Sequence, residues 1–561
     1  MRVADYVAKY LKSLGVNEVF MLTGYGAMYL NDAIKLSGIK YYATRNEATA
    51  PIMAESYARI KKKVGVACVT AGPGSTNAIP GLAEAYVDSA PIIILSGQVD
   101  YEHTTHSTKS KNIRTFGTAE INIVPIVKSI TKYAQIIINP KDTKFILEKA
   151  FFLATNGRPG PVWIDIPLNV QKSEINPKNL RGFRIKKEKR NSLRISKDTI
   201  RIIELIKKSS RPLIVAGNGV QQSEMTSKLK KIISKIKIPV ILSRFAQDIF
   251  SHDDKYILGQ GGIKGSRYCK KIMNSCDLVL SLGCRMAPQF VGHDFSAFKK
   301  AKVIAIDIEK DELTKKGQKI DLTVNVDLKD FMPKFLNKIK NIKFPDYKSW
   351  TNYCENLKKN NPIIRSKVQK NPIDLYYFMQ KLGDLSKKGD ILITDAGSNY
   401  YVGGQVWKFK KKQKEVTSGS NAAMGLSVPL AIGAAVAAPK SRILAVTGDG
   451  SLELNIQELK TISHNNFNIK LFVINNGGYV SMHNWADSFF KGRRLDTAEE
   501  TGAGTLNFKN VAKAFDLSHY LIKDVNKIEK DLKNIFNHKR PVFVEVITDP
   551  HQKIFDAFKD Y

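Results

Sequence analysis

The feature that most constrains the fold is the alternation of short apolar runs with helical patterns along most of the chain. The apolar runs have the length and composition of buried strands, and they lie at residues 18–22, 64–70, 91–96, 162–166, 213–216, 277–282, 303–308, 391–394, 442–447, 470–474 and 542–546. Repeated strand–helix units of this kind form parallel sheets that helices cover on both faces. The pattern therefore predicts an α/β fold made of doubly wound parallel sheets.

Two basic stretches divide this pattern into three parts. The first covers residues 167–196 and the second about 329–361, and we interpret both as lysine-rich connections with little regular structure. The predicted domains are residues 1–170, 195–330 and 370–545, each near the usual domain size.

The chain is strongly basic, with 88 lysines and arginines against 52 aspartates and glutamates, a formal charge of +36. Such an excess favours polyanionic partners when it is gathered on one face. Here the lysines are spread along the whole length, which is typical of solvated helix faces and linkers. We therefore do not expect nucleic-acid binding, although a non-catalytic basic binding protein stays an alternative.

Cysteine usage and hydropathy indicate a cytoplasmic protein without a membrane span. The five cysteines include no C-x-x-C pair, so neither a disulfide framework nor a zinc site is indicated. Residues 1–14 mix apolar side chains at helical spacing with both acidic and basic residues, which predicts an amphipathic helix and not a secretory signal. The uncharged stretch 422–439 is rich in Ala, Gly and Ser, and we interpret it as a buried helix.

The most informative segment, residues 441–479, joins two predicted strands through a helix. The first strand ends in Gly448-Asp449-Gly450-Ser451 and the second in Asn475-Asn476. Such a unit crosses over right-handedly, so both strand ends lie at the same edge of the sheet and Asp449 and Asn476 can face one point. Carboxylate and amide oxygens suit Mg²⁺, and the glycines let backbone N–H groups approach phosphate oxygens. A tight turn with a capped helix is the alternative.

This segment resembles the cofactor motif of thiamine-diphosphate enzymes. The resemblance implies that Mg²⁺ is held by Asp449, the Asn476 side chain and the Gly478 main-chain carbonyl. It places the diphosphate that the metal clamps beside the turn residues Gly448, Gly450 and Ser451. It further implies a cradle of backbone and side-chain donors for the same diphosphate at Gly397, Ser398 and Asn399.

Glu47 lies where a predicted strand gives way to a helix, with alanines around it. Thiamine-diphosphate chemistry needs a carboxyl group that hydrogen-bonds the pyrimidine ring, so that the 4′-amino group becomes basic enough to remove the thiazolium proton. An apolar pocket that raises the pKa of this carboxyl suits that task. Alone, Glu47 is explained as a charge favoured by the helix macrodipole. The resemblance instead makes Glu47 catalytic, and it puts Pro73 and Asn77 of the next turn against the cofactor.

Four motifs occur in the order found in the large catalytic subunit of acetolactate synthase: Glu47, the turn 72–77, the segment 157–162 and the metal motif. The resemblance covers about residues 3–546, and it is closer still to the acetolactate-synthase-like enzymes of surface-polysaccharide gene clusters. It implies that the glutamate and the diphosphate site come from different subunits of a homodimer or homotetramer. It also implies that Met424 props the cofactor into a bent form and that the Ala422 carbonyl accepts from its 4′-amino group, although core filling would explain Met424 alone.

The predicted substrate pocket departs from the acetolactate synthase pattern. That family has a Phe-Gln-Glu segment where this chain has Thr118-Ala119-Glu120, so no glutamine orients the reacting carbonyl. Simple keto-acid decarboxylases supply paired histidines in this region, but residues 114–120 contain none, which favours carboligation. His103 and His106 could serve a metal or proton transfer, and we interpret them as surface-loop residues. The residues that we expect to shape the pocket are Tyr25, Gly26, Ala119, His483 and Trp485.

The middle domain has the pattern of a nucleotide-binding fold. The strand 213–216 is followed by Gly217-Asn218-Gly219, and the strand 303–308 contains Asp307. A lone G-x-G turn is weak evidence for a ligand. Acetolactate synthases bind FAD in this domain as a structural, non-redox element. The glycine-rich loop 259–267 could accept FAD, but we favour a domain without it.

The sequence and the resemblance together imply a thiamine-diphosphate- and Mg²⁺-dependent enzyme. We expect it to decarboxylate a 2-keto acid, with pyruvate as the favoured substrate, and to transfer the two-carbon fragment to a second carbonyl compound. The acceptor is either a second keto acid, which gives acetolactate, or a keto sugar nucleotide. Plain decarboxylation, and a non-catalytic protein on a degenerate fold, stay open as alternatives.

Overall fold

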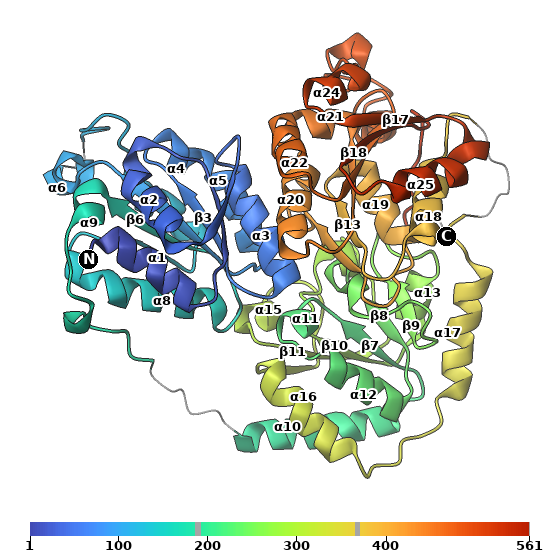
Figure 1. Ribbon diagram of the computed structural model, residues 1–561. Coiled ribbons are helices and arrows are strands. Elements are labelled where there is room, and N and C mark those ends of the chain that lie inside the picture. The colour runs from blue at the N-terminus through green and yellow to red at the C-terminus, as the bar shows by residue number, and fades with distance from the viewer. Residues whose placement is uncertain (111, 186–191, 365–370, 560–561) are drawn as a thin grey trace.

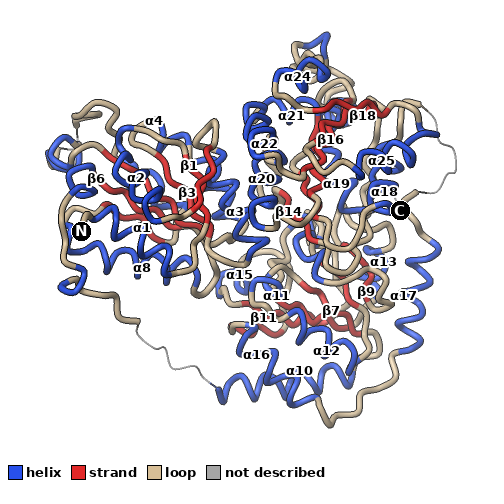
Figure 2. The backbone as a smooth tube through the Cα atoms, viewed as in Figure 1, coloured by secondary structure: helices blue, strands red, loops and turns tan. Residues whose placement is uncertain are grey.

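The computed structural model describes residues 1–110, 112–185, 192–364 and 371–559. It contains three six-stranded sheets, and each pair of neighbouring strands within them is parallel. Figure 1 shows the three α/β units in blue to teal, green to yellow, and orange to red, and Figure 2 shows helices around each group of strands. The predicted α/β class with three parallel-sheet units is confirmed.

The first sheet has the strand order β2-β1-β3-β4-β6-β5. Its strands are β1 (Glu18–Met21), β2 (Lys40–Ala43), β3 (Gly65–Val69), β4 (Ile92–Gln98), β5 (Tyr133–Ile136) and β6 (Val162–Pro167). Its helices are α1 (Val3–Ser13), α2 (Met28–Ser37), α3 (Thr49–Lys61), α4 (Pro73–Asn77), α5 (Ile79–Val87), α6 (Thr105–Thr108), α7 (Ile123–Val127), α8 (Thr143–Thr155) and α9 (Leu168–Lys172). The central strands β3, β4 and β6 are buried along their whole length, as expected for a sheet covered on both faces.

The central sheet, read from β9, has the order β9-β8-β7-β10-β11-β12, which is the order of dinucleotide-binding folds. Its strands are β7 (Pro212–Ala216), β8 (Val240–Leu242), β9 (Ile257–Gln260), β10 (Leu278–Leu282), β11 (Lys302–Asp307) and β12 (Leu322–Asn325). The helices of this part are α10 (Ser192–Lys208), α11 (Gly219–Gln222), α12 (Thr226–Ile236), α13 (Cys269–Ser275), α14 (Pro288–Val291), α15 (Lys310–Thr314), α16 (Leu328–Ile339) and α17 (Lys348–Asn360).

The third sheet, β14-β13-β15-β16-β18-β17, repeats the order of the first when the strands of each are counted in sequence. Its strands are β13 (Ile391–Thr394), β14 (Lys414–Thr417), β15 (Ile443–Gly448), β16 (Ile469–Asn475), β17 (Ser518–Ile522) and β18 (Val542–Ile547). The helices are α18 (Leu375–Leu385), α19 (Gly397–Val406), α20 (Ser427–Ala437), α21 (Asp449–Glu453), α22 (Leu459–Asn465), α23 (Val480–Phe489), α24 (Phe508–Ala514) and α25 (Ile528–Asn537).

The expectation of little regular structure at residues 329–361 is wrong, because α16 and α17 fill most of this stretch. In α16 the apolar residues recur at helical spacing and are buried, whereas the lysines that suggested a linker lie on the other positions. The stretch 167–196 contains α9 near its beginning and the first residues of α10 at its end. The short 3₁₀-helix 177–179 lies between them, and residues 186–191 are outside the described residues.

Residues 427–437 of the stretch 422–439 form the buried helix α20, which confirms that interpretation for this part, whereas residues 422–426 belong to the preceding loop. Every residue of α20 is buried, and Pro429 is tolerated because it lies in the first turn, where backbone N–H groups have no partner within the helix. Within the described ranges, none of the helices has the length and apolarity of a membrane span.

Helices α3 and α20 join the first and third units of the chain. Gly433 permits their close approach, since a Cβ there would lie 2.2 Å from the carbonyl oxygen of Met53. The Ser56 hydroxyl donates to the Leu430 carbonyl across the same contact, at 2.6 Å. Apolar side chains of both units therefore form one continuous core, which fixes the two sheets relative to each other.

Candidate active site

The predicted site residues of the first unit gather at one edge of its sheet. Tyr25 and Gly26 follow β1, Glu47 follows β2 and the turn 72–77 follows β3, so parallel pairing brings them to the same side. The Asn77 side-chain amide donates to Glu47 Oε2 at 3.1 Å. A Cβ on Gly74 would lie 2.6 Å from Thr70 Cγ2, so close packing requires the glycine, and the same Cβ would come within 3.4 Å of Glu47 Oε1.

Ala119 lies against the same turn. The backbone at Gly72 has φ of +57°, and a Cβ there would lie 2.3 Å from the Ala119 carbonyl oxygen. Ala119 itself has φ of +59°, a strained conformation for a residue with a side chain. The segment is held by Glu120, which is buried and accepts from the Thr105 hydroxyl at 2.8 Å and the Phe116 N–H at 3.2 Å.

Gly26 is buried, and its carbonyl accepts from the Gln171 side-chain amide at 2.6 Å. The neighbouring Tyr25 side chain is 74% exposed. The described single chain therefore brings Glu47, Gly26 and Ala119 to one sheet edge and leaves the Tyr25 ring open to contact another molecule.

The predicted metal ligands meet at the corresponding edge of the third sheet. Asp449 follows β15 and is 2% exposed. Its Oδ2 accepts from the backbone N–H groups of Asn476, at 3.1 Å, and Gly478, at 3.0 Å, while Oδ1 accepts from the Gly450 N–H at 2.8 Å. Burial raises the pKa of Asp449, and these backbone donors oppose the rise. The two strand ends are thus tied together around one carboxylate.

Asp395 is a buried residue of this edge that the sequence analysis did not single out. Its Oδ2 accepts from the hydroxyls of Ser451, at 2.6 Å, and Thr447, at 2.9 Å, and its Oδ1 accepts from the Asn399 amide at 3.2 Å. Asp395 therefore connects the end of β13, the start of α19 and the Asp449 turn. Its position directly after an apolar strand was a usable signal, because side chains there lie at the carboxyl edge of a parallel sheet.

The residues of this edge fit a diphosphate and a hard cation. Gly397, Gly477 and Gly478 adopt positive φ angles of +73°, +78° and +120°, which leave backbone groups without a covering Cβ. The Asn399 Oδ1 atom is buried without a hydrogen-bond partner, and one carboxylate with amide and carbonyl oxygens matches the preferences of Mg²⁺. The described residues contain no cluster of three or more His, Cys, Asp or Glu side chains, so a cation here would also need phosphate or water oxygens.

The loop after β14 carries Ala422 and Met424, and acidic residues of the first unit hold it in place. The Asn421 amide donates to Glu84 Oε2 at 2.8 Å, and the Ser420 N–H donates to Asp88 Oδ1 at 3.3 Å. Arg59 pairs with Asp88 at 3.6 Å and also donates to the Thr417 carbonyl at 3.0 Å.

Burial raises the pKa values of Glu84 and Asp88, the two acidic residues that hold this loop. Ala422 has φ of +52°, a left-handed backbone conformation that is uncommon for a residue with a side chain. Met424 is partly exposed in the single chain.

The remaining predicted residues differ in their surroundings. His483 is buried in α23 and its Nε2 atom lies 2.7 Å from the Thr497 carbonyl oxygen, so its ring is engaged within the third unit. Trp485 is 59% exposed and packs against Phe489 with ring centroids 5.2 Å apart. His103 and His106 are both exposed, as expected of surface-loop residues.

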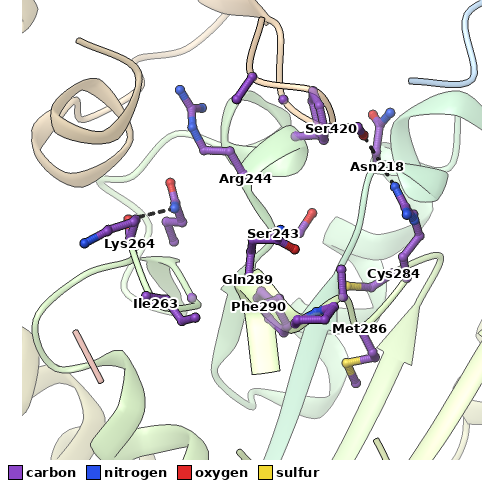
Figure 3. A pocket seen from close by; sticks show the side chains of 18 of the residues that line it. Asn218, Ser243, Arg244, Ile263, Lys264, Cys284, Met286, Gln289, Phe290 and Ser420 are labelled. Atoms are coloured by element: carbon purple, nitrogen blue, oxygen red, sulfur yellow. Dashed lines mark hydrogen bonds between the residues drawn. The ribbon is translucent and has the colours of Figure 1, made fainter. Parts of the chain in front are cut away.

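A cavity of about 1550 Å³ opens between the three units, and Figure 3 shows part of its lining around Arg244, Lys264 and Gln289. Its wall extends from Asp307 of the central sheet to Ser481 and Trp485 of the third unit. The three arginines of the wall are already ion-paired: Arg158 and Arg285 with Glu312, and Arg244 with Glu415.

The Gly217 turn at the end of β7 is explained by close packing. A Cβ on Gly217 would lie 2.0 Å from the Gly283 carbonyl oxygen, where β10 ends. The G-x-G pattern therefore has a steric cause that is independent of any ligand.

The two edge groups are not joined within one chain. Among the residues that the structure describes, no hydrogen bond or ion pair links Glu47 or Asn77 to Asp449, Asn476 or Gly478. The Glu47 group and the Asp449 group are thus each held by contacts of their own.

Comparison with known proteins gives a consistent result along the chain. Residues 1–121 match the N-terminal TPP-binding domain of thiamine pyrophosphate enzymes, 199–335 the central domain and 395–546 the C-terminal TPP-binding domain. The chain is 29% identical to the acetolactate synthase large subunit of Lactococcus lactis, over 98% of this chain and 93% of that protein. It is 29% identical to the probable acetolactate synthase large subunit of Methanocaldococcus jannaschii, over 99% of this chain and 93% of that protein.

A third relative, acetolactate synthase 1 of Nicotiana tabacum, is 30% identical over 88% of this chain and 73% of that protein. The matched domains contain both halves of the site: Glu47 lies in the N-terminal match, and Asp449 and Asn476 lie in the C-terminal match. The chain therefore belongs to the thiamine-diphosphate-dependent enzymes, among those that resemble the acetolactate synthase large subunit.

Proposed function

We propose that the protein uses thiamine diphosphate and Mg²⁺ to decarboxylate a 2-keto acid, with pyruvate as the favoured substrate, and transfers the two-carbon fragment to a second carbonyl compound. The observation that carries this proposal is the arrangement at Asp449, whose carboxylate accepts from the N–H groups of Asn476 and Gly478. In this proposal the Asn476 side chain and the Gly478 carbonyl would add oxygen ligands beside the buried acid. Gly397, Ser398 and Asn399 would hold the diphosphate.

Thiamine diphosphate supplies the nucleophilic carbon and the electron sink that decarboxylation of a 2-keto acid requires. The protein's contribution at the other end is Glu47. Since Asn77 donates to Oε2, Oε1 is the oxygen of Glu47 that remains available to exchange a proton. Asn77 thereby orients the carboxyl group.

We propose that the complete site forms between two copies of the chain, in a homodimer or homotetramer. The family resemblance, which assigns Glu47 and the diphosphate site to different subunits, supports this proposal, and among the described residues no hydrogen bond or ion pair joins the two groups. Large apolar side chains are also exposed next to both groups: Tyr25 is 74% exposed, Leu454 56% and Trp485 59%. Apolar surface of this kind is covered in stable assemblies.

The proposed acceptor is a carbonyl compound. Ala119 offers no side-chain donor, and residues 114–120 include no histidine. This segment therefore supplies no imidazole that could protonate the product. The cavity beside Trp485 supports an acceptor larger than pyruvate, such as a keto sugar nucleotide. Plain decarboxylation is the second candidate, and it would need a proton donor from outside residues 114–120.

The five cysteines are free, and four of them are buried, which supports a cytoplasmic location. The test of the proposed function is incubation of the purified protein with pyruvate, thiamine diphosphate and Mg²⁺. Carbon dioxide release with a carboligated product, from pyruvate alone or with an added keto sugar nucleotide, is the expected result. Acetaldehyde as the sole product supports the second candidate, and no turnover of any 2-keto acid contradicts both.

A further inference from the structure

Glu458 is a fully buried carboxyl group that connects the third unit to the loop carrying Glu47. It ends the short 3₁₀-helix η7 (Ile456–Glu458), just beyond the Asp449 turn, and its relative exposure is 0%. Its Oε1 accepts from the Arg45 N–H at 2.7 Å and from the Thr49 hydroxyl at 2.8 Å. These two donors lie two positions before and two positions after Glu47.

The other oxygen of Glu458 is also fixed. Oε2 accepts from the Thr461 hydroxyl at 2.7 Å, which anchors the carboxyl group on the third unit. Within the described part of the chain, no lysine, arginine or histidine forms an ion pair with Glu458. A buried carboxyl without a countercharge is costly, so hydrogen bonds alone hold this group in place.

The other restraints near Glu47 are mostly local: the Thr49 hydroxyl also lies 2.7 Å from the Asn46 carbonyl oxygen, and the Ala50 N–H donates to the Glu47 carbonyl at 3.3 Å. The Ala48 N–H donates to Asn46 Oδ1 at 2.8 Å, and the Asn77 side-chain amide donates to the Glu47 carboxylate.

Glu458 connects this loop to the third unit through short hydrogen bonds, and the Thr461 hydroxyl adds a longer one to the Ala43 carbonyl, at 3.4 Å. A small movement of the loop changes the position of the Glu47 carboxyl. Since proton exchange requires this group to lie within hydrogen-bond reach of its partner, such a movement slows the exchange.

We propose that Glu458 is a positioning residue that sets the Glu47 carboxyl for proton exchange with the cofactor. This inference rests on the proposed function of Glu47. Glu458 touches neither substrate nor cofactor in this account, and it acts through the Arg45 N–H and the Thr49 hydroxyl.

The test compares Glu458→Ala and Thr49→Val with two controls. Glu458→Gln retains an acceptor oxygen for Arg45 and Thr49 and is the rescue variant. Ser56→Ala removes a buried hydrogen bond on the same α3–α20 contact without touching the Glu47 loop. Thr49→Val keeps the side-chain volume, so it remains informative where Glu458→Ala fails to fold.

Three quantities are measured: backbone hydrogen exchange of the 43–50 segment without cofactor, affinity for thiamine diphosphate with Mg²⁺, and deuterium exchange at the thiazolium carbon of the bound cofactor. We expect Glu458→Ala and Thr49→Val to lose protection in the segment and to slow thiazolium exchange by about tenfold to a hundredfold, with cofactor affinity changed less. Glu458→Gln should recover much of both, and Ser56→Ala should change neither.

The proposal is overturned when a folded Glu458→Ala or Thr49→Val protein exchanges the thiazolium deuterium as fast as the wild type, or when Ser56→Ala slows it equally. Failure of the proposed function is a separate outcome. In that case the wild-type protein itself does not accelerate thiazolium exchange, or Glu47→Gln leaves its rate unchanged.

Discussion

The carboxylate of Asp449 accepts a hydrogen bond from the backbone N–H of Asn476 at 3.1 Å, across 27 positions of sequence. This contact ties the ends of two neighbouring parallel strands, β15 and β16, to one acidic side chain. It makes the Asp449 turn a preformed structure, so a cation would find the carboxylate and the Asn476 backbone already in place.

Mixing two inactive variants should restore activity if each site combines residues of two chains. Glu47→Gln and Asp449→Asn each inactivate both sites of their own homodimer. In a mixed dimer one site contains both substitutions and the other contains neither, so random re-association should return about a quarter of wild-type activity. Activity after mixing and subunit exchange is the measurement. No recovery in proteins shown to have exchanged subunits would place Glu47 and Asp449 in the same-chain site.

Glu47→Gln should bind thiamine diphosphate nearly as well as the wild type but slow deuterium exchange at the thiazolium carbon. The amide still accepts from Asn77 through its oxygen, but it cannot take up a proton as the carboxyl group does. Loss of one acid–base group costs about 10²- to 10⁴-fold in rate. Exchange is followed by proton NMR after acid quench. An unchanged exchange rate would refute the role of Glu47.

Asp165→Asn should remove part of the pH dependence of stability. Asp165 on β6 is buried between the Ser96 hydroxyl, at 2.5 Å, and the Gln98 amide, at 3.3 Å, and burial raises its pKa to about 7. The folded protein therefore binds this proton more tightly than the unfolded chain. The stability that this provides is complete below the usual pKa of an aspartate and is lost as pH rises through about 7.

The magnitude is at most about 4 kcal/mol, since each pKa unit corresponds to about 1.4 kcal/mol. Denaturant unfolding of both proteins at pH ~5 and pH ~8 measures it. The stability of Asp165→Asn relative to the wild type should increase from the lower to the higher pH. The exposed Asp516→Asn serves as a control. If Asp165→Asn and the wild type differ in free energy of unfolding by the same amount at both pH values, the raised pKa of Asp165 is contradicted.

The purified protein should carry no flavin. The arginines that line the large cavity are held by Glu312 and Glu415, and a pyrophosphate would have to displace those carboxylates. The absorption spectrum of the protein and of its heat-released supernatant tests this directly. A stoichiometric flavin would show that these ion pairs rearrange when the cavity is filled.

The sequence predicted the central strands well and the edge strands poorly. The edge strands β2, β5, β9, β12, β14 and β17 and the short interior strand β8 are absent from the predicted apolar runs. Most of them are partly exposed, so their sequences mix polar and apolar residues and lack the continuous pattern of a doubly covered strand. The helices α16 and α17 were missed for the opposite reason, because their exposed lysines hide an apolar stripe.

The site could be predicted where a motif follows a strong strand. Asp449 and Asn476 each follow such a strand end, and parallel pairing then places them at a sheet edge. Glu47 follows the mostly exposed edge strand β2, and the family resemblance was what singled it out. Asp395 directly follows β13 and could have been assigned in the same way, but Glu458 could not, since its importance lies in hydrogen bonds to a segment remote in sequence. Glu458 contacts Arg45 across 413 positions, a relationship that periodicity and local motifs do not contain.

The most direct test of the account is titration calorimetry of thiamine diphosphate into the metal-free protein, with and without Mg²⁺, for the wild type and Asp449→Asn. The account predicts tight binding to the wild type only when Mg²⁺ is present, and loss of this metal dependence in Asp449→Asn. Binding of equal strength with and without Mg²⁺, or no binding to the wild type at all, would contradict it.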